Sequence, residues 1–570
     1  MVDFIKTQNS FAHGEVSPEF FACDDIAGLA KLENMDVISG GGLRRRPGLA
    51  NVATLSAQAR IIPFSASETE KYILVIGNYS MSVMSGNGTL VQGLVTPWPY
   101  TDVAKLQYAQ RFGTIIFVHP DYQPRIMSKK DNRFEINLFD FERNNNMTVN
   151  VPFMKFDDAT GITITVTANS GGNNFATFTT NSDFWTENNV GERLFLMNLQ
   201  WLITSYVDAK TVVAYTTTSY TVPSEAITDW YEAAFSDARG WPCSITFHQD
   251  RLVFGGSRSY PSGIWMSQVG RHRNFSVGTG LDDEAIFVTL VSGQRQQICT
   301  VVSSDNLQIL TSVGEWAISN KPLTPSSVDI KQHTSVGSVA SRYMAPQKIE
   351  GQTVFISENM RDIRELSLDD LGERYNANDL CAMAKHLMNT PVDIAYNASD
   401  HKLFVVMDGG EMAVLNQNSA QEISAWGKYT TNGKFKSVAV VDNITYVVVQ
   451  RGNNFSLEKF TLSALDDVGT GFGFCASGLP LRASGHNISR LRIRKIVVRV
   501  LNTKSLFIND KRATLPNEAY NNDSPGFSGD VDITQLGTTR DCINSPWKIH
   551  GDDALPATVL SVSMYGNYGI

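Results

Sequence analysis

The sequence contains no apolar run that approaches the roughly 20 residues a helix needs to span a bilayer. Residues 1–8 show no basic stretch followed by an apolar one, so we expect no secretory signal peptide. The motifs His-Glu-x-x-His and Gly-x-Ser-x-Gly are also absent, which leaves no support for a zinc protease or an esterase-type nucleophile. These absences predict a protein made in the cytoplasm and point away from these classes of enzyme.

Cysteine and charge are both sparse. The 6 cysteines form no Cys-x-x-Cys pair, so we expect free and mostly buried thiols, not disulfides or a zinc site. They are Cys23, Cys243, Cys299, Cys381, Cys475 and Cys542. Charged residues make up 18% of the chain and the net charge is −9, so the chain as a whole is no nucleic-acid clamp.

What the sequence does contain favours an all-β protein. Thr, Val, Asn, Ser and Gly are frequent, and runs of helix-forming residues are scarce. With 570 residues, the chain exceeds one compact core and predicts two to four domains.

A repeated unit is seen most clearly at residues 239–276, where three short strands joined by tight turns match a propeller blade in size. The middle strand of this unit, about four apolar residues between polar turns, recurs along the chain. Its copies begin at Tyr72, Ile115, Leu252, Leu307, Val354, Leu403 and Tyr446. The steps are 43, 137, 55, 47, 49 and 43 residues, and propeller repeats have periods of roughly 40 to 50. We predict about seven blades, with a segment inserted between the second and the third. Unrelated hairpins in two or three sandwiches remain the alternative.

The domains follow from this spacing. Residues 1–57 form an N-terminal arm, with a short helix expected from Asp24 to Met35, and 467–570 form a C-terminal β domain; together they make a platform. Blades one and two occupy 58–139, a small β domain is inserted at 140–235, and the remaining blades occupy 236–466. The fold class is thus all-β, a propeller-like body with an inserted β domain and a β platform.

Two groups of basic residues are candidate contact sites. Arg44, Arg45 and Arg46 lie beside a Gly-rich turn, where a solvated loop is the alternative. Arg490, Arg492 and Arg494 alternate in a predicted strand and share one face, while Leu491, Ile493 and Val497 face the other way. Three like charges on one face repel each other unless a partner neutralises them. We expect a contact with another subunit or a neighbouring ring; DNA phosphates or plain solvation are the alternatives.

Competing chemistries find less support. The glycine clusters lack the lysine and the strand–helix context of a nucleotide loop. The acidic pairs are adjacent in sequence, so their side chains diverge in a strand, unlike the facing carboxylates of a glycosidase. The repeated Ser-x-Asp-x-Gly-x-x-x-Trp turn of propeller sialidases is missing.

Several motifs follow one another along nearly the whole chain. The N-terminal ones are Phe-x-x-Gly-Glu-x-Ser-Pro at 11–18 and Gly-Gly-x-x-Arg-Arg-Pro-Gly at 41–48. Later ones include Phe247 to Ser257, Thr311 to Trp316 and Leu555 to Leu560. In this order they resemble the tail nozzle proteins of short-tailed bacteriophages, also called tail tubular protein B. The resemblance marks an N-terminal docking motif, made of Phe11, Gly14, Glu15, Ser17, Pro18, Pro47 and Gly48.

The resemblance implies a structural protein of the virion tail, assembled in the host cytoplasm, and no enzyme. Six copies would surround a channel below the adaptor ring, retain and then conduct the double-stranded genome without sequence specificity, and anchor fibre or spike proteins. No cofactor, metal or small-molecule substrate is implied. Six copies would carry 6 × −9 = −54 formal charges, which would limit DNA adhesion. A receptor-binding adhesin or spike and a propeller glycosidase are the alternatives.

Overall fold

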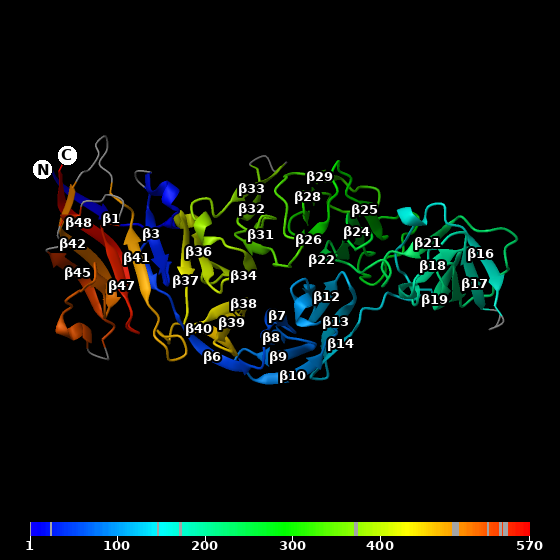
Figure 1. The fold of residues 1–570 in the computed structure, drawn as a ribbon, viewed down its shortest axis with the longest axis horizontal. Coiled ribbons are helices and arrows are strands. Elements are labelled where there is room, and N and C mark those ends of the chain that lie inside the picture. The colour runs from blue at the N-terminus through cyan, green and yellow to red at the C-terminus, as the bar shows by residue number, and fades with distance from the viewer. Residues whose placement is uncertain are drawn as a thin grey trace.

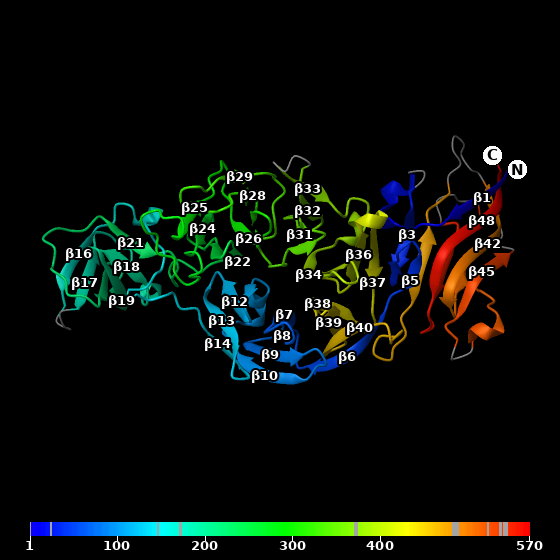
Figure 2. The same ribbon diagram turned by 180° about the vertical axis from the view of Figure 1, so that it is seen from behind.

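The structure is a computed structural model that describes residues 2–22, 26–144, 148–169, 174–369, 374–481, 490–520, 524–534, 538–539 and 545–569. These residues form β-strands almost entirely, and the one α-helix among them, α1 (Tyr100–Val103), is a single turn. Within the described ranges, no helix is both long and apolar enough to cross a membrane. The molecule is elongated, with a propeller in the middle, the platform and both termini at one end, and the insert at the other (Figures 1 and 2).

Seven four-stranded antiparallel blades form the body, which confirms the propeller-like fold. Blades 1 and 2 are β7 (Arg60–Ser65) to β10 (Leu90–Val95) and β11 (Gln107–Arg111) to β14 (Arg133–Leu138). Blades 3, 4 and 5 are β22 (Ser244–His248) to β25 (Ile286–Thr289), β26 (Ile298–Ser303) to β29 (Ile330–Gln332), and β30 (Gln347–Ile349) to β33 (Tyr375–Asp379). Blade 6 comprises β34 (Pro391–Asn397), β35 (Lys402–Met407), β36 (Met412–Asn418) and β37 (Ile423–Tyr429). Blade 7 comprises β38 (Lys434–Val441), β39 (Ile444–Arg451), β40 (Asn454–Thr461) and β6 (Gly48–Leu55).

The periodic apolar elements of the sequence are the second strand of each blade. These strands are β8 (Lys71–Ile76), β12 (Thr114–His119), β23 (Arg251–Gly255), β27 (Leu307–Thr311), β31 (Gln352–Ile356), β35 and β39. They are nearly all buried because each lies between two other strands and between two neighbouring blades. Apolar clusters fill all seven spaces between adjacent blades, so the ring is closed by packing.

Tight hairpins join several of these strands. Asp131 and Asn132 connect β13 (Tyr122–Lys130) to β14, and Asp442 and Asn443 connect β38 to β39, all with φ between 48° and 63°. Two consecutive residues with positive φ make the turn whose twist matches antiparallel strands, and Asn and Asp tolerate it best among residues with side chains.

The axis of the propeller is crossed by the chain itself. The segment 338–344 lies against the inner strands of several blades: the Tyr343 carbonyl accepts a bond from Arg60 Nη2 (3.1 Å), and the Tyr343 N–H donates to Ala104 O (2.8 Å). Arg342 Nη1 donates to Val392 O (3.3 Å) in blade 6, and Ser338 O accepts from the Cys299 thiol of blade 4. The centre of the ring therefore holds polypeptide.

The N-terminal arm differs from its prediction in two ways. Residues 48–55 belong to the propeller and not to the platform, because β6 pairs with β40 as the outermost strand of blade 7. The short helix expected from Asp24 to Met35 is wrong: β3 (Gly28–Glu33) is a strand, fixed by pairing with β41 (Phe474–Gly478). Tertiary pairing here overrides local helix propensity.

The insert has a seven-stranded sheet from β15 (Phe153–Met154) to β21 (Trp230–Ala233) and its own core around Trp185, Trp201 and Trp230. The platform combines the two chain ends. In one sheet, β1 (Val2–Gln8), β4 (Met35–Val37) and β5 (Leu43–Arg45) join β42 (Arg490–Thr503), β45 (Phe527–Thr534) and β48 (Thr558–Gly569).

Candidate functional site at the propeller–platform joint

The candidate site residues converge where blade 6 meets the platform; we call residues 11–48 and 466–478 the joint. Strand β2 (Gly14–Glu15) pairs in parallel with β37 on one side and with β3 on the other. Beyond β3 the sheet continues through β41, β47 (Lys548–Gly551), β43 (Phe507–Ile508) and β44 (Lys511–Arg512). One ten-stranded sheet thus runs from the inner edge of blade 6 into the platform.

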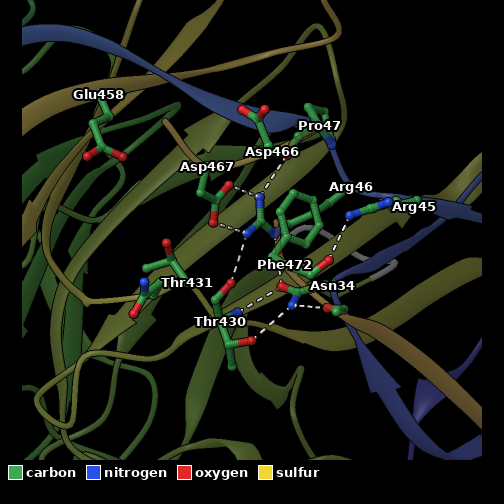
Figure 3. A network of polar contacts seen from close by, with 12 residues as sticks. Asn34, Arg45, Arg46, Pro47, Thr430, Thr431, Glu458, Asp466, Asp467 and Phe472 are labelled. Carbon is green, nitrogen blue, oxygen red and sulfur yellow. Dashed lines mark hydrogen bonds and ion pairs between the residues drawn. The ribbon is translucent and has the colours of Figure 1, made fainter. Parts of the chain in front are cut away.

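Arg46 is the centre of the joint (Figure 3). Its side chain is 0% exposed, and its two Nη atoms donate to the Asp467 carboxylate at 3.0 and 2.6 Å. Further bonds run from Nε to Asn34 Oδ1 (2.9 Å) and from Nη2 to Thr430 O (2.8 Å). The guanidinium also lies 3.6 Å from the ring centre of Phe472. A forked cation held in plane by a carboxylate and stacked on a ring is the geometry for which Arg is suited and Lys is not.

Arg45 is buried beside it. Its Nη atoms donate to the carbonyl oxygens of Asp553, Leu555 (3.0 Å) and Phe472 (2.7 Å). Burial, together with the positive charge of Arg46, lowers the pKa of Arg45 to about 10. The prediction that Arg45 and Arg46 contact another subunit is therefore wrong, because both side chains are buried inside their own chain; of the three arginines only Arg44 is exposed.

The N-terminal motif faces inward in the same way. Phe11 is 0% exposed and meets Trp547 edge-to-face, with ring centres 6.1 Å apart. Glu15 accepts from the Leu32 N–H (2.7 Å) and lies 2.8 Å from His386 Nε2, while Ser17 Oγ lies 2.9 Å from His386 Nδ1.

The glycines of the motif are required by close packing. Gly14 has φ +61°, and a Cβ there would lie 2.3 Å from Trp426 O. Gly48 would place a Cβ 2.2 Å from Asp466 O, and Pro47 before it is half-buried. The motif predicted for docking on the tail thus docks the arm onto its own propeller; only Pro18 is exposed.

The arginines of β42 are arranged differently from the prediction. Ile493 pairs with Gly566 and Lys495 with Tyr565, so Arg494 is the extra residue of a β-bulge. After the bulge the buried positions are Ile496, Val498 and Val500, and Val497 does not share the buried face expected for it.

The basic face of β42 is largely neutralised within the chain. Arg494 pairs with Asp3 (3.3 Å), Lys495 with Asp532 (3.1 Å) and Arg499 with Asp530 (2.8 Å). Arg492 is exposed and has no ion-pair partner among the described residues. Only the backbone of Arg490 is described, so its side chain lies outside the described atoms.

A cleft of about 510 Å³ opens beside the joint, between the platform and blades 6 and 7. Its platform wall holds Asp36 and Arg44, and its propeller wall holds Lys402, Asn416 and Tyr429. Asp36 is fully buried, pairs with Lys402 Nζ (2.6 Å) and accepts a bond from the Tyr429 hydroxyl. Burial first, and then the Asp36 carboxylate, raise the pKa of Tyr429 well above its usual value.

No motif in the sequence marks Asn34, Asp36, Asp467 or Phe472. Each is an ordinary polar or aromatic residue in a stretch without periodic pattern, and Asp467 lies 421 residues from Arg46. The Gly-Gly-x-x-Arg-Arg-Pro-Gly motif was the only signal near this network.

One group in blade 5 has metal-ligand atoms close together: Asp362, Asp379 and Cys381. Lys385 lies 3.3 and 3.1 Å from the two carboxylates, so a cation already occupies the position a metal would take. Burial raises the pKa of Cys381 to about 12, which keeps the thiol protonated and makes it a poor ligand. Cys243, Cys299, Cys381 and Cys475 are free, as expected; Cys23 and Cys542 lie outside the described residues.

No family model and no curated protein matches the sequence. Among solved structures, similarity is found to the WD40 repeats of RRP9 (TM-score 0.35, 6% identity, 73% of this chain and 100% of that one). It is also found to BamB from Moraxella catarrhalis (TM-score 0.32, 10% identity, 73% and 100%) and to the C-terminal WD40 domain of Sif2 (TM-score 0.33, 10% identity, 73% and 99%). These values carry no argument about function, and the seven-bladed architecture rests on the strand pairings.

Proposed function

We propose that this protein is a structural subunit of the tail tube of a short-tailed bacteriophage, the tail nozzle, and not an enzyme. One observation carries the proposal: the two N-terminal motifs of the resemblance, at 11–18 and 41–48, are the segments that lock the propeller to the platform. A tube wall must transmit force along its length without bending. A continuous sheet and a buried Arg46–Asp467 pair give an elongated subunit that stiffness.

The occupied propeller axis adds a geometric argument. Because segment 338–344 crosses the ring, DNA cannot use the propeller axis as its conduit. A DNA channel would have to lie between copies, with six subunits around it in the virion tail. A formal charge of −9 per copy would keep the DNA phosphates from adhering to the wall.

Contacts between copies, or with an adaptor ring above, would use exposed groups that are not neutralised internally. Among the described residues, Arg492 on β42 and Arg44 are exposed and have no ion-pair partner. Guanidinium groups bind carboxylates with two parallel bonds, and an acidic neighbour supplies many candidates. Fibre or spike proteins would attach elsewhere on the same ring.

The test is rotational symmetry. Two-dimensional cryo-electron microscopy averages of the purified protein, alone and mixed with its adaptor ring, should show six-fold rings, with a light-scattering mass near six chains. Arg492→Ser should weaken ring formation more at low salt than at high salt, because high salt already screens the charge pair that the substitution removes. Arg494→Ser is the matched control. A monomer under all conditions, including mixtures with adaptor, would contradict the proposal.

The alternative, a receptor-binding tail protein, is supported by one feature, the cleft that holds the exposed Arg44. A trimeric mass would favour it. The glycosidase alternative needs two carboxylates that act together, and of the two in this cleft Asp36 is tied to Lys402 and Tyr429 while Asp400 is exposed.

A further inference from the structure

A second pocket, of about 260 Å³, lies where the insert meets the propeller. Its walls come from the end of blade 2, from the two segments that connect the insert to the propeller, and from the insert loop that leads into β18 (Arg193–Leu196). Two arginines line it: Arg143 from the first connecting segment and Arg193 from the insert. The pocket thus holds one cation from each side of this attachment.

Strand pairing brings the two arginines together. Arg143 pairs with Val149 across an isolated β-bridge. The side-chain amide of Gln200, in the insert, accepts a bond from the Val149 N–H (2.8 Å) and donates one to Val149 O (2.9 Å). Gln200 also pairs with Phe195 of β18, two residues after Arg193. The connecting segment is therefore fixed against the part of the insert that carries Arg193.

Neither guanidinium group has an acceptor. In the part of the chain that the structure describes, Arg143 and Arg193 form no hydrogen bond and no ion pair. Arg193 is half-buried, and burial first, then the positive charge of Arg143, lower its pKa, with no carboxylate acting against them. A guanidinium offers five N–H donors, and leaving them unpaired away from water costs free energy. The two like charges also repel each other.

Three acids line the same pocket without neutralising these charges. Glu192 is 2% exposed and already accepts two hydrogen bonds from other residues. Asp237 accepts a bond from the Trp241 indole (2.8 Å). Asp140 and Asp237 are both exposed, and neither forms an ion pair with either arginine. Solvent screens exposed charges that are not in contact, so the acids leave the arginine pair unsatisfied.

The arginine pair selects a ligand by charge and shape. Two guanidinium groups carry two positive charges, and a carboxylate offsets only one of them. A phosphate monoester carries about −1.5 to −2 at pH 7 and has three strong acceptor oxygens. Its geometry suits the two-pronged donors of arginine. The volume of about 260 Å³ lies just below the roughly 300–1,000 Å³ of sites that enclose a whole drug-sized ligand, so it suits a phosphate group with a small substituent.

We propose that this pocket binds a dianionic phosphate group, from a phosphate monoester or from free phosphate, between Arg143 and Arg193. A phosphodiester, as in DNA, carries a single charge per phosphate and satisfies the pair less well. Because one arginine belongs to the connecting segment and the other to the insert, the bound phosphate would tie the insert to the propeller. The inference does not depend on the proposed tail function.

The test is titration calorimetry of the full chain with inorganic phosphate, phenyl phosphate and dimethyl phosphate near pH 7.5. The first two are mainly dianions at this pH, and dimethyl phosphate has the same tetrahedral centre with one charge. At least one dianion should bind saturably at a single site, and dimethyl phosphate should bind about tenfold or more weakly, the effect of losing a charged hydrogen bond. Tighter binding of phenyl phosphate than of inorganic phosphate identifies an ester as the ligand, and the reverse identifies free phosphate.

Variants locate the site. Arg143→Gln and Arg193→Gln should each weaken binding of the dianion about tenfold, and Arg143 is exposed, so its variant tests binding without disturbing the fold. Arg492→Gln, at an exposed arginine of the platform, is the control and should change nothing. In phosphate-free buffer, Arg193→Gln should melt at the parent temperature or above it, because it removes an unpaired, half-buried charge. Saturable binding of neither dianion, equal affinity for dimethyl phosphate, or unchanged affinity of Arg143→Gln would each overturn the proposal.

Discussion

The propeller is attached at its two ends in opposite ways. Toward the platform, the sheet of blade 6 continues without a break, and the buried Arg46–Asp467 pair seals the contact. Toward the insert, no strand of a blade pairs with a strand of the insert in the part of the chain that the structure describes. Two chain segments connect the insert to the propeller instead. They are joined to each other where the Ala234 N–H donates a hydrogen bond to Pro152 O (2.8 Å).

The insert attachment relies on buried charge. Arg239 donates to both oxygens of Glu232 (2.7 Å each) and to Asp158 (2.7 Å). A second acid, Glu192, is 2% exposed and accepts bonds from Asn189 (2.6 Å) and Ser236 (3.1 Å). Burial, and then the Glu232 carboxylate, raise the pKa of Glu192 to about 8. Strand pairing itself involves no titratable group, whereas the contacts around Arg239 and Glu192 include three carboxylates and one guanidinium, so their contribution to stability depends on pH.

The largest expected effect is at the stiff joint. Arg46→Met should lower the free energy of unfolding by about 3–5 kcal/mol, because Asp467 is left as an unpaired buried charge. Urea denaturation measures it. Arg46→Met combined with Asp467→Leu should recover part of the loss, since both charges are then gone. A loss below about 1 kcal/mol for the single variant would show that the joint is held by the sheet alone.

The second largest expected effect is at Gly14 on β2, in the ten-stranded sheet that joins blade 6 to the platform. Gly14→Ala should cost about 1–3 kcal/mol, because alanine disfavours φ +61° and its Cβ would meet Trp426 O. Gly93→Ala on β10 is the matched control, since a Cβ there meets nothing within 4 Å. Equal urea midpoints for the two variants would contradict the close approach of β2 to β37.

At the other joint the effect depends on pH. A carboxyl whose pKa rises from 4.5 to about 8 on folding keeps its proton longer in the folded state. The Glu192 carboxyl does not change the free energy of unfolding below about pH 4.5, where it is protonated in both states. It lowers this free energy increasingly as the pH rises, and the effect reaches its full size above about pH 8. Glu192→Gln should therefore be more stable than the parent at pH 9 and equal to it near pH 4. Urea titrations at both pH values measure this, with exposed Glu187→Gln as control; a pH-independent difference would contradict it.

The smallest effect belongs to the platform surface. Arg494→Ala should change the free energy of unfolding by about 0–1 kcal/mol, because the Arg494–Asp3 pair is exposed and screened by solvent. Thermal unfolding at low and high salt checks it. A larger loss would mean that the bulge at Arg494, and not its charge, stabilises β42.

The sequence predicts features that depend on neighbouring residues and does not predict features that depend on residues far away in the chain. The second strands of the blades, such as β8 and β39, could be found because alternation and turn residues are encoded within a few positions. The bulge at Arg494 could not, since a one-residue shift depends on the partner β48. Arg46 looked like a surface charge because its partner, Asp467, lies 421 residues away. Of the six arginines predicted to make contacts, Arg44, Arg492 and Arg494 are exposed and Arg45 and Arg46 are buried, while the side chain of Arg490 lies outside the described atoms.

Strand β6 has a consequence for how the chain is made. It leaves the ribosome early, but its partner β40 begins at Asn454, about 400 residues later. At roughly 5–20 residues per second, β6 waits on the order of 20–80 s without its partner strand. During that time the nascent ring is open and its apolar β6 edge is available to other chains. Ring closure is thus a late event of synthesis, and crowding of polysomes should favour misassembly between neighbouring nascent chains.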